Sequence, residues 1–275
     1  MGRLRFTKMH GLGNDFVVVD GRGGAAHLSA HAMRTLADRH TGIGCDQVIT
    51  LGPSAHAHAT MAIHNADGSQ AEACGNAARC VGALLIAEAG GGEVAIDTPA
   101  GVIRACDEGA GRIAVDMGEA RFDWRAIPLS EPCDTLHLAI EAGPLRDPAA
   151  VSMGNPHAVF FVPDAEAVDL ARWGPELEHH PFFPRRTNVE VATVRAPGEV
   201  RLRVWERGAG ITRACGTGAC ATVVAAVRRG LGPRRAKVAL DGGTLAIEWR
   251  DDGHVVMAGP AAVTFCGETA PGLLA

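Results

Sequence analysis

Two cysteines of this 275-residue chain each stand directly before a stretch of helical character. Cys74 opens the segment Cys-Gly-Asn-Ala-Ala-Arg-Cys, and Cys215 opens the segment Cys-Gly-Thr-Gly-Ala-Cys. A thiol at a helix start lies among backbone N–H groups that have no partner within the helix, at the positive end of the helix dipole. Such a position lowers the pKa of a cysteine and favours the thiolate. Since the same N–H groups can bind a carboxylate, we expect two reactive thiols, with one carboxylate held between the two helix starts.

The spacing between these cysteines recurs along the chain. Cys215 follows Cys74 by 141 residues. The same offset relates four further pairs: Gly13–Asn14 and Gly154–Asn155, Gln47 and Asn188, Asn65 and Glu206, and Gly118 and Gly259. Chance could align any one pair of common residues, but it does not account for all of them at one offset. The sequence therefore predicts two homologous halves related by a pseudo-two-fold axis, with a site in the cleft between them.

Both halves follow one order of elements. Helical spacing is found over residues 28–40 and 169–179, and Ala-rich helices are expected over 77–89 and 218–229. Alternating segments at 93–103 and 237–249 are typical of hairpins. We predict an α+β protein of two pseudo-symmetric α/β domains, residues 1–120 and 121–262, with residues 121–132 as the connector.

Two thiols on opposite sides of a carbon atom could invert its configuration. One would remove the α-proton as thiolate while the other supplies a proton as thiol, so a single proton is shared by the pair. Pyridoxal phosphate is the usual alternative for amino acids, but the chain offers only Lys8 and Lys237 for a Schiff base, and neither lies in a suggestive motif. We therefore expect amino-acid racemisation or epimerisation without a cofactor.

Composition narrows the possible partners. With 47% hydrophobic residues the chain can bury a large core. A net charge of -5 and a sequence pI near 6.2 do not favour a nucleic-acid partner. No apolar run is long enough to cross a bilayer and the N-terminal residues read as a strand, so we expect a cytoplasmic protein without membrane contact. The eight cysteines lack any C-x2-C pair, and we expect neither zinc nor a disulfide framework.

Six motifs together resemble the diaminopimelate epimerase family over essentially the whole length. They span residues 9–16, 65–69, 74–76, 154–157, 206–210 and 214–220. The resemblance implies cofactor-independent interconversion of LL- and meso-2,6-diaminopimelate, on the route to lysine and the bacterial cell wall. It also implies a homodimer and a C-terminal strand, within residues 263–275, that returns to the first domain.

The resemblance also assigns roles to residues. Cys74 and Cys215 would be the acid/base pair, and His157 and Glu206 would tune the pKa values of the thiols. The reacting carboxylate would be held by Gly75, Asn76, Gly216 and Thr217. The rest of the substrate would be bound by Asn14, Gln47, Asn65, Asn155, Asn188, Glu206 and Arg207. Three positions depart from the family pattern, namely His64, Ala77 and Ile211, and they bear on the fit near each cysteine.

Other interpretations remain open at this point. Asn14 and Asn155 follow glycines and could be turn residues, and Glu206 with Arg207 could be a solvated pair at a strand end. The chain could be a related two-cysteine racemase of the proline or hydroxyproline type, or an amino-acid binding protein without catalysis. Activity on proline alone would favour the first, and substrate binding without exchange of the α-hydrogen would favour the second.

Overall fold

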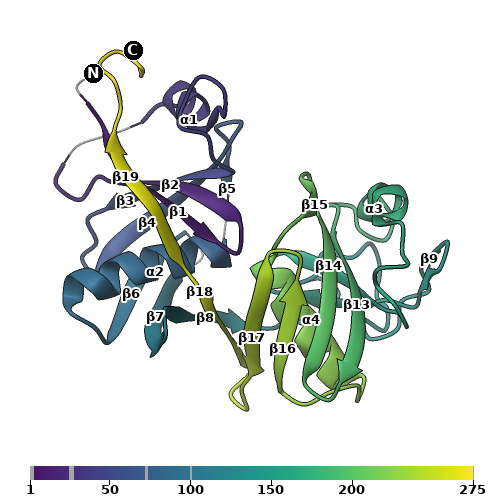
Figure 1. Ribbon diagram of the computed structural model, residues 1–275. Coiled ribbons are helices and arrows are strands. Elements are labelled where there is room, and N and C mark those ends of the chain that lie inside the picture. The colour runs from purple at the N-terminus through teal and green to yellow at the C-terminus, as the bar shows by residue number, and fades with distance from the viewer. Residues whose placement is uncertain (1–2, 25–27, 72–73, 100, 275) are drawn as a thin grey trace. The chain divides into compact units, whose positions relative to one another are not determined.

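The chain divides into two compact units in the computed structural model, which describes residues 3–24, 28–71, 74–99 and 101–274 (Figure 1). Unit 1 comprises residues 1–115 and 259–275, and unit 2 comprises residues 116–258. The units are mixed α and β, which confirms the predicted fold class. Among the described residues, no helix combines the length and the apolar character that crossing a bilayer requires.

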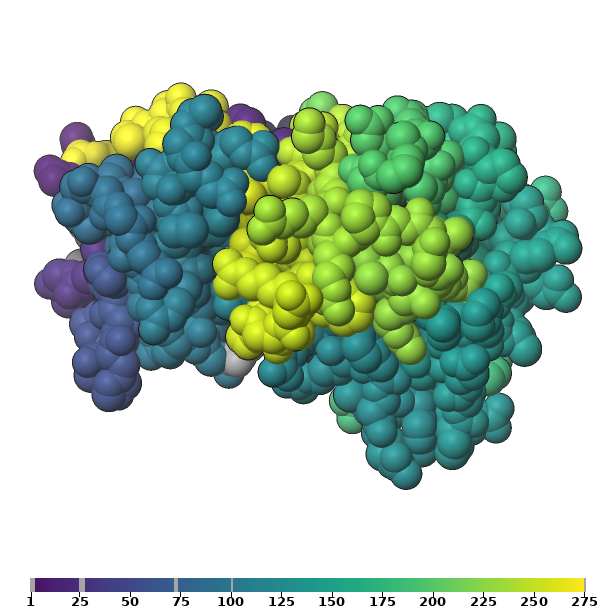
Figure 2. Space-filling model, turned by 90° about the horizontal axis from the view of Figure 1, so that it is seen from below, coloured from purple at the N-terminus to yellow at the C-terminus, as the bar shows by residue number. Residues whose placement is uncertain are grey.

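Unit 1 is built on a sheet whose first and last strands in the sequence are neighbours. β1 (Arg5–Gly11) pairs antiparallel with both β2 (Asn14–Asp20) and β19 (Ala262–Glu268). In Figure 2 the yellow atoms of the C-terminal segment accordingly lie beside purple N-terminal atoms. The remaining elements of this unit are α1 (Ala30–Ala37), β3 (Gln47–Gly52), β4 (Ala59–Asn65), β5 (Gln70–Ala71), α2 (Gly75–Ala89), β6 (Glu93–Thr98), β7 (Gly101–Gly109) and β8 (Arg112–Glu119), whose last residues belong to unit 2.

Unit 2 repeats this order after a short two-stranded ribbon. The ribbon is formed by β9 (Glu141–Ala142) and β10 (Leu145–Arg146). The repeated elements are β11 (Ala149–Ser152), β12 (Pro156–Phe161), α3 (Leu170–Glu178), β13 (Asn188–Ala196), β14 (Glu199–Glu206), β15 (Gly210–Thr212), α4 (Gly216–Arg228), β16 (Arg235–Leu240), β17 (Gly243–Trp249) and β18 (His254–Pro260).

Strand register confirms the internal repeat. In the parallel pair of β2 and β3, Phe16 lies opposite Gln47, and in the parallel pair of β12 and β13, His157 lies opposite Asn188. Both residues of the second pair are 141 positions after those of the first. A strand register cannot slip by one residue without moving every side chain to the other face, so equivalent positions have equivalent orientations in the two units.

The long helices α2 and α4 are core helices. Every residue from Gly75 to Gly82 in α2 and from Gly216 to Ala226 in α4 is buried. Most of these residues are small, which lets neighbouring strands approach the helices closely. Helices that are mostly apolar around their circumference, as these are, are expected to be buried. Figure 1 shows α4 behind the strands of unit 2. Because both helices are enclosed, their first turns are held firmly in place.

The predicted helices are confirmed, with differences at two N-termini. Ser29 caps α1 by accepting a hydrogen bond from the N–H of Ala32 (3.2 Å), and Asp169 caps α3 in the same way. The helices α2 and α4 each begin two residues earlier than the Ala-rich stretches indicated. Cys74 and Cys215 are therefore the N-cap residues themselves.

The prediction of a connector over residues 121–132 is wrong. This segment belongs to unit 2, where Ile127 is fully buried and Leu129 nearly so in its hydrophobic core. The N–H of Arg121 also donates to the carbonyl of Ser152 (2.9 Å). The proline and glutamate content suggested a connector, but the apolar residues between them anchor the segment in unit 2. The boundaries between units fall within β8 and within β18 instead.

Candidate active site

Each unit places one cysteine at the N-terminus of its buried helix. Cys74 has φ -150° and ψ 107°, and Cys215 has φ -121° and ψ 112°, the extended conformation of an N-cap residue. The Sγ atom of Cys215 accepts a hydrogen bond from the N–H of Gly218 (3.4 Å). A sulfur atom in this position is stabilised as an anion by the first turn of the helix.

Asn14 faces Cys74 in unit 1. The turn between β1 and β2 has positive φ at Leu12 (57°) and Gly13 (85°), as a two-residue hairpin turn requires. It ends at Asn14, whose Oδ1 accepts hydrogen bonds from Cys74 Sγ (3.8 Å) and Asn76 Nδ2 (3.2 Å). The turn, the strand and the helix start thus bring three predicted site residues into one cluster.

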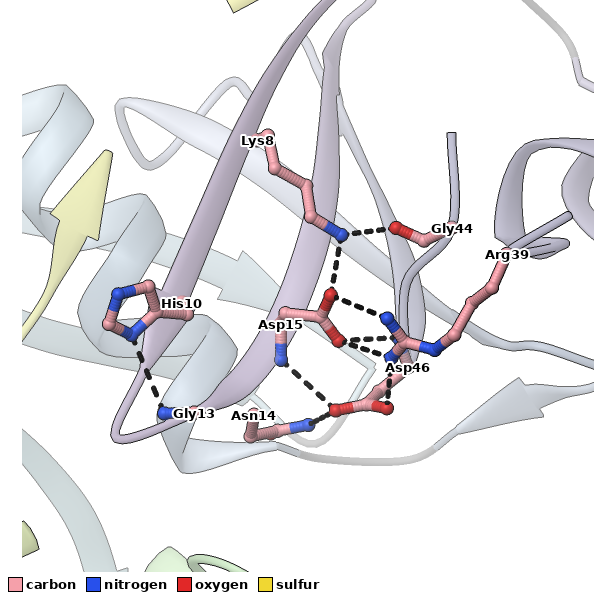
Figure 3. A network of polar contacts seen from close by, with 8 residues as sticks. All are labelled: Lys8, His10, Gly13, Asn14, Asp15, Arg39, Gly44 and Asp46. Atoms are coloured by element: carbon pink, nitrogen blue, oxygen red, sulfur yellow. Dashed lines mark hydrogen bonds and ion pairs between the residues drawn. The ribbon is translucent and has the colours of Figure 1, made fainter. Parts of the chain in front are cut away.

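A network of charged groups fixes the side chain of Asn14 (Figure 3). Asn14 Nδ2 donates to Asp46 Oδ2 (2.9 Å), which also accepts from the backbone N–H of Asp15 (3.1 Å). Lys8 and Arg39 both bind the carboxylate of Asp15, at 2.6 Å and 2.7 Å. Burial alone would raise the pKa of Asp15, but the hydrogen bonds from Arg39 and Lys8 outweigh it and hold that pKa well below its usual range.

Gln47 and Asn65 lie opposite one another where β3 starts and β4 ends. Gln47 Nε2 donates to Asn65 Oδ1 (2.9 Å), and Asn65 Nδ2 donates to Ser69 Oγ (3.1 Å). Because Gln47 is also opposite Phe16 in β2, these amides lie close to the strand that carries Asn14.

A chain of hydrogen bonds leads from Cys215 into the core of unit 2. Thr217 Oγ1 lies 3.6 Å from Cys215 Sγ and accepts a hydrogen bond from Asn155 Nδ2 (3.3 Å). Asn155 Oδ1 lies 2.9 Å from His157 Nε2. His157 Nδ1 lies 2.7 Å from Glu190 Oε1, and both of these side chains are completely buried. The sequence had indicated four of these five residues but not Glu190.

Burial, together with two nearby carboxyl groups, reverses the expected direction of the Cys215 pKa shift. Burial raises the pKa of Cys215 well above its usual value, and the nearby carboxylates of Glu206 and Glu190 add to this effect. Hydrogen bonds from Thr217 and Gly218 act in the opposite direction but do not compensate. The expectation of a lowered pKa is therefore wrong for Cys215. The helix start alone would lower the pKa, but burial and the neighbouring carboxylates raise it by more.

The carboxyl group of Glu206 is held by two donors, one hydroxyl group and one thiol. Thr212 Oγ1 donates to Glu206 Oε1, and the Cys215 thiol also hydrogen-bonds to this carboxylate. Burial raises the pKa of Glu206, while the hydrogen bond from Thr212 lowers it by a smaller amount.

Asn188 supports the backbone that carries Arg207. The buried amide of Asn188 accepts a hydrogen bond from the N–H of Arg207 (2.9 Å) and donates one to the carbonyl of Pro156 (2.9 Å). The guanidinium group of Arg207 is exposed and donates to the carbonyl of Arg185 (3.3 Å). Arg207 is thus presented at the end of β14, next to Glu206.

Asp46, Glu190 and Thr212 form hydrogen bonds with predicted site residues and were themselves missed from the sequence. Glu190 carried a usable signal, since it is a lone charge in the apolar stretch 189–192 and lies 141 positions after Ile49. Asp46 and Thr212 had none, because their roles depend on strand pairing. Within the described part of the chain, no group of three or more His, Cys, Asp or Glu side chains could hold a metal ion.

Comparison with known proteins identifies the relatives of the chain. A family model described as Diaminopimelate epimerase matches residues 6–123 and 149–264. The diaminopimelate epimerase of Rhodospirillum centenum is 58% identical over 272 residues, covering 98% of this chain and 94% of that protein. The diaminopimelate epimerase of Acidiphilium cryptum is 53% identical over 270 residues, covering 98% of each.

Solved structures share the fold at low sequence identity. A hydroxyproline epimerase from Agrobacterium vitis, with bound trans-4-hydroxy-L-proline, has a TM-score of 0.69 at 16% identity and covers 98% of this chain and 93% of its own. A predicted epimerase from Pseudomonas aeruginosa has a TM-score of 0.66 at 19% identity, covering 97% and 99%. At these identities the likeness concerns the fold alone.

Proposed function

The chain belongs to the diaminopimelate epimerase family, and we propose that it interconverts LL- and meso-2,6-diaminopimelate without a cofactor. The observation that carries the proposal is the cysteine at the N-cap of each buried helix, Cys74 in one repeat and Cys215 in the other. A reaction that moves a proton from one face of a carbon atom to the other needs one such group on each side.

In the proposed reaction the two thiols act on one α-carbon. The thiolate of one cysteine takes the α-proton, the electron pair of the broken C–H bond stays on the substrate, and the thiol of the other cysteine delivers its proton to the opposite face. Afterwards the first cysteine is a thiol and the second a thiolate, so atoms and charge balance. The reverse reaction uses the same two groups in exchanged roles.

The developing carbanion needs stabilisation at the α-carboxylate. The first N–H groups of α2 and α4 belong to Gly75, Asn76, Gly216 and Thr217, which we propose hold this carboxylate. Donors fixed in place before the reaction stabilise charge as it forms and need no reorganisation. The burial of both helices supports this role, because it keeps the donors rigid.

We propose that Glu206 and Arg207 bind the second amino-acid head of the substrate. Arg207 suits its carboxylate and Glu206 its ammonium group, while the amides of Asn14, Gln47, Asn65, Asn155 and Asn188 fix orientation. An ammonium group at Glu206 would offset one of the charges that raise the pKa of Cys215. Substrate binding would thereby lower the pKa of Cys215, which is the pKa-tuning role that we propose for Glu206. For His157 this role is proposed from the family resemblance.

We further propose a homodimer, which the family resemblance supports, and a cytoplasmic location, which is the expectation from the sequence. Light scattering coupled to size-exclusion chromatography measures the molar mass in solution. A mass twice the 28.5 kDa of the chain is expected, and a mass equal to the chain would contradict the dimer.

Incubation with LL-diaminopimelate under reducing conditions, followed by separation of stereoisomers, tests the reaction directly. Formation of the meso isomer is expected, with no racemisation of L-proline or trans-4-hydroxy-L-proline in parallel samples. Turnover of proline without turnover of diaminopimelate would instead support the racemase alternative. Binding of diaminopimelate without any exchange of its α-hydrogen would support a non-catalytic binding protein.

A further inference from the structure

The two repeats differ in polarity at equivalent positions behind their cysteines. His157 and Glu190 of unit 2 correspond, at the offset of 141, to Phe16 and Ile49 of unit 1. All four side chains have no exposed surface. Their strand partners are also equivalent, so the same location in the fold holds an apolar pair in one unit and a hydrogen-bonded pair in the other.

A third position changes together with this pair. Gly218 in the first turn of α4 corresponds to Ala77 in α2. A Cβ atom on Gly218 would lie 2.8 Å from Glu190 Oε1 and 3.3 Å from Cys215 Sγ. A Cβ contact of 2.8 Å essentially never occurs, so glycine at this place makes room for the Glu190 carboxyl group where it stands. Unit 1, with Ile49 in place of the glutamate, carries alanine there.

The hydrogen bonds of His157 define where protons lie. Asn155 Nδ2 donates to Thr217, so its Oδ1 faces His157 Nε2 as an acceptor, and Nε2 carries a hydrogen. The contact of 2.7 Å between His157 Nδ1 and Glu190 Oε1 then also needs a proton. That proton belongs either to a neutral glutamic acid or to an imidazolium, and in both forms the pair has no net charge.

Full ionisation of Glu190 alone would be costly. Its second oxygen, Oε2, is buried and has no hydrogen-bond partner among the described residues. An ion without compensating hydrogen bonds is strongly destabilised in a protein interior. Sharing a proton with His157 avoids that cost and leaves less negative charge near Cys215.

We propose that Glu190 is a positioning residue for the epimerisation, because the proton that it shares with His157 fixes the ring so that Nε2 donates to Asn155. The consequence reaches the sulfur atom. Because Thr217 Oγ1 accepts from Asn155, the hydroxyl hydrogen of Thr217 is available to Cys215 Sγ, 3.6 Å away. Glu190 thus orients a donor to the thiolate through three intervening side chains. This inference rests on the proposed function.

Two substitutions separate this role from packing. Glu190→Gln retains an N–H donor for His157 Nδ1 without charge, and kcat is expected to stay within about threefold of wild type. Glu190→Leu removes the donor at similar volume, and kcat is expected to fall by about tenfold or more while KM changes by less than about threefold. The matched control Ile49→Val alters the equivalent position of unit 1 and should leave both constants nearly unchanged.

Equal kcat values for Glu190→Leu and wild type would overturn the proposal, since Glu190 would then only fill space. An equal loss in Glu190→Gln and Glu190→Leu would also overturn it, since a charged carboxylate would then be required. The double variant His157→Phe with Glu190→Ile recreates the apolar pair of unit 1 and should fold but turn over as slowly as Glu190→Leu.

Nitrogen NMR of ¹⁵N-histidine-labelled, ligand-free protein tests the ring directly, with His157→Phe used to assign the signal. A hydrogen on His157 Nε2 is expected in wild type, and a bare Nε2 with the hydrogen only on Nδ1 would contradict the proposal. This measurement needs neither substrate nor a Glu190 variant. If wild type failed to convert LL-diaminopimelate, the proposed function would fail while the NMR result still reported on the ring.

Discussion

Asp46 accepts a hydrogen bond of 2.9 Å from the side chain of Asn14, and this contact decides which end of the Asn14 amide faces Cys74. With Nδ2 bound to Asp46, the oxygen of Asn14 is the atom that meets the thiol and Asn76. A residue that sequence patterns did not single out therefore orients one that they did.

Removal of this contact should slow the reaction without abolishing it. Asp46→Ala leaves the Asn14 amide able to rotate, and we expect kcat/KM for LL-diaminopimelate to fall by about three- to tenfold. Steady-state kinetics on the purified variant gives the number. Asp251→Ala, which removes a carboxylate with 99% exposed side-chain surface, is the matched control and should behave as wild type. An unchanged kcat/KM in Asp46→Ala would show that Asn14 is held by other contacts.

The Asp15 network predicts how the stability of unit 1 depends on pH. The pKa of Asp15 is lowered in the folded protein, so its contribution is fully present above the unfolded pKa of about 3.9 and is lost as the pH falls below it. Asp15→Asn removes this contribution, and the variant should lose less stability than wild type between neutral pH and pH 3. Urea unfolding at several pH values measures how the free energy of unfolding depends on pH, with Asp251→Asn as control. The same pH dependence in all three proteins would show that Asp15 does not contribute to it.

Thr212 should influence the pH at which Glu206 loses its charge. The hydroxyl group lowers the pKa of Glu206 by donating to the ionised carboxylate, so Thr212→Val raises that pKa further. If ionised Glu206 binds the substrate ammonium, the acidic limb of the kcat/KM profile moves to higher pH in this variant. Thr212→Ser keeps the hydroxyl and should keep the wild-type limb. If the pH profile of Thr212→Val coincided with that of wild type, the ionisation of Glu206 would not be what sets the acidic limb of kcat/KM.

Gly218 and Ala77 offer a matched pair of substitutions in the two repeats. Gly218→Ala forces a methyl group against Glu190 and Cys215, and we expect a loss of about 1–3 kcal/mol of stability together with slower turnover. Ala77→Gly introduces no such clash and should cost about 1–2 kcal/mol through lower helix propensity and the loss of a buried methyl group, with little change in turnover. Chemical denaturation and kinetics on both variants check this. Stability unaffected by Gly218→Ala would mean that the Glu190 side chain can move away.

Local signals made much of the fold predictable. The capping residues Ser29 and Asp169 and the small residues of the two core helices act within a few turns, and the structure confirms them. The offset of 141 residues shows in the sequence because the second half repeats the pattern of the first, and the strand registers confirm it. The place of residues 121–132 in the core of unit 2 was not predictable in this way, because the burial of Ile127 depends on strands that come later in the chain.

The environment of each thiol depends on the same kind of long-range packing. A helix start alone favours the thiolate, yet Cys215 is surrounded by Glu190 and Glu206, which arrive from β13 and β14. Their distance from Cys215 in space has no local signature in the sequence. Comparison of the repeats does reveal Glu190, since Ile49 stands at the equivalent place.

The use of two thiols on one α-carbon is tested most directly by proton NMR of LL-diaminopimelate in deuterated water with reduced protein. We expect wild type to exchange one α-hydrogen for deuterium as the meso isomer forms. Cys74→Ala and Cys215→Ala should each abolish this epimerisation while circular dichroism shows them folded. Formation of the meso isomer at the wild-type rate by either folded variant would contradict the two-thiol mechanism.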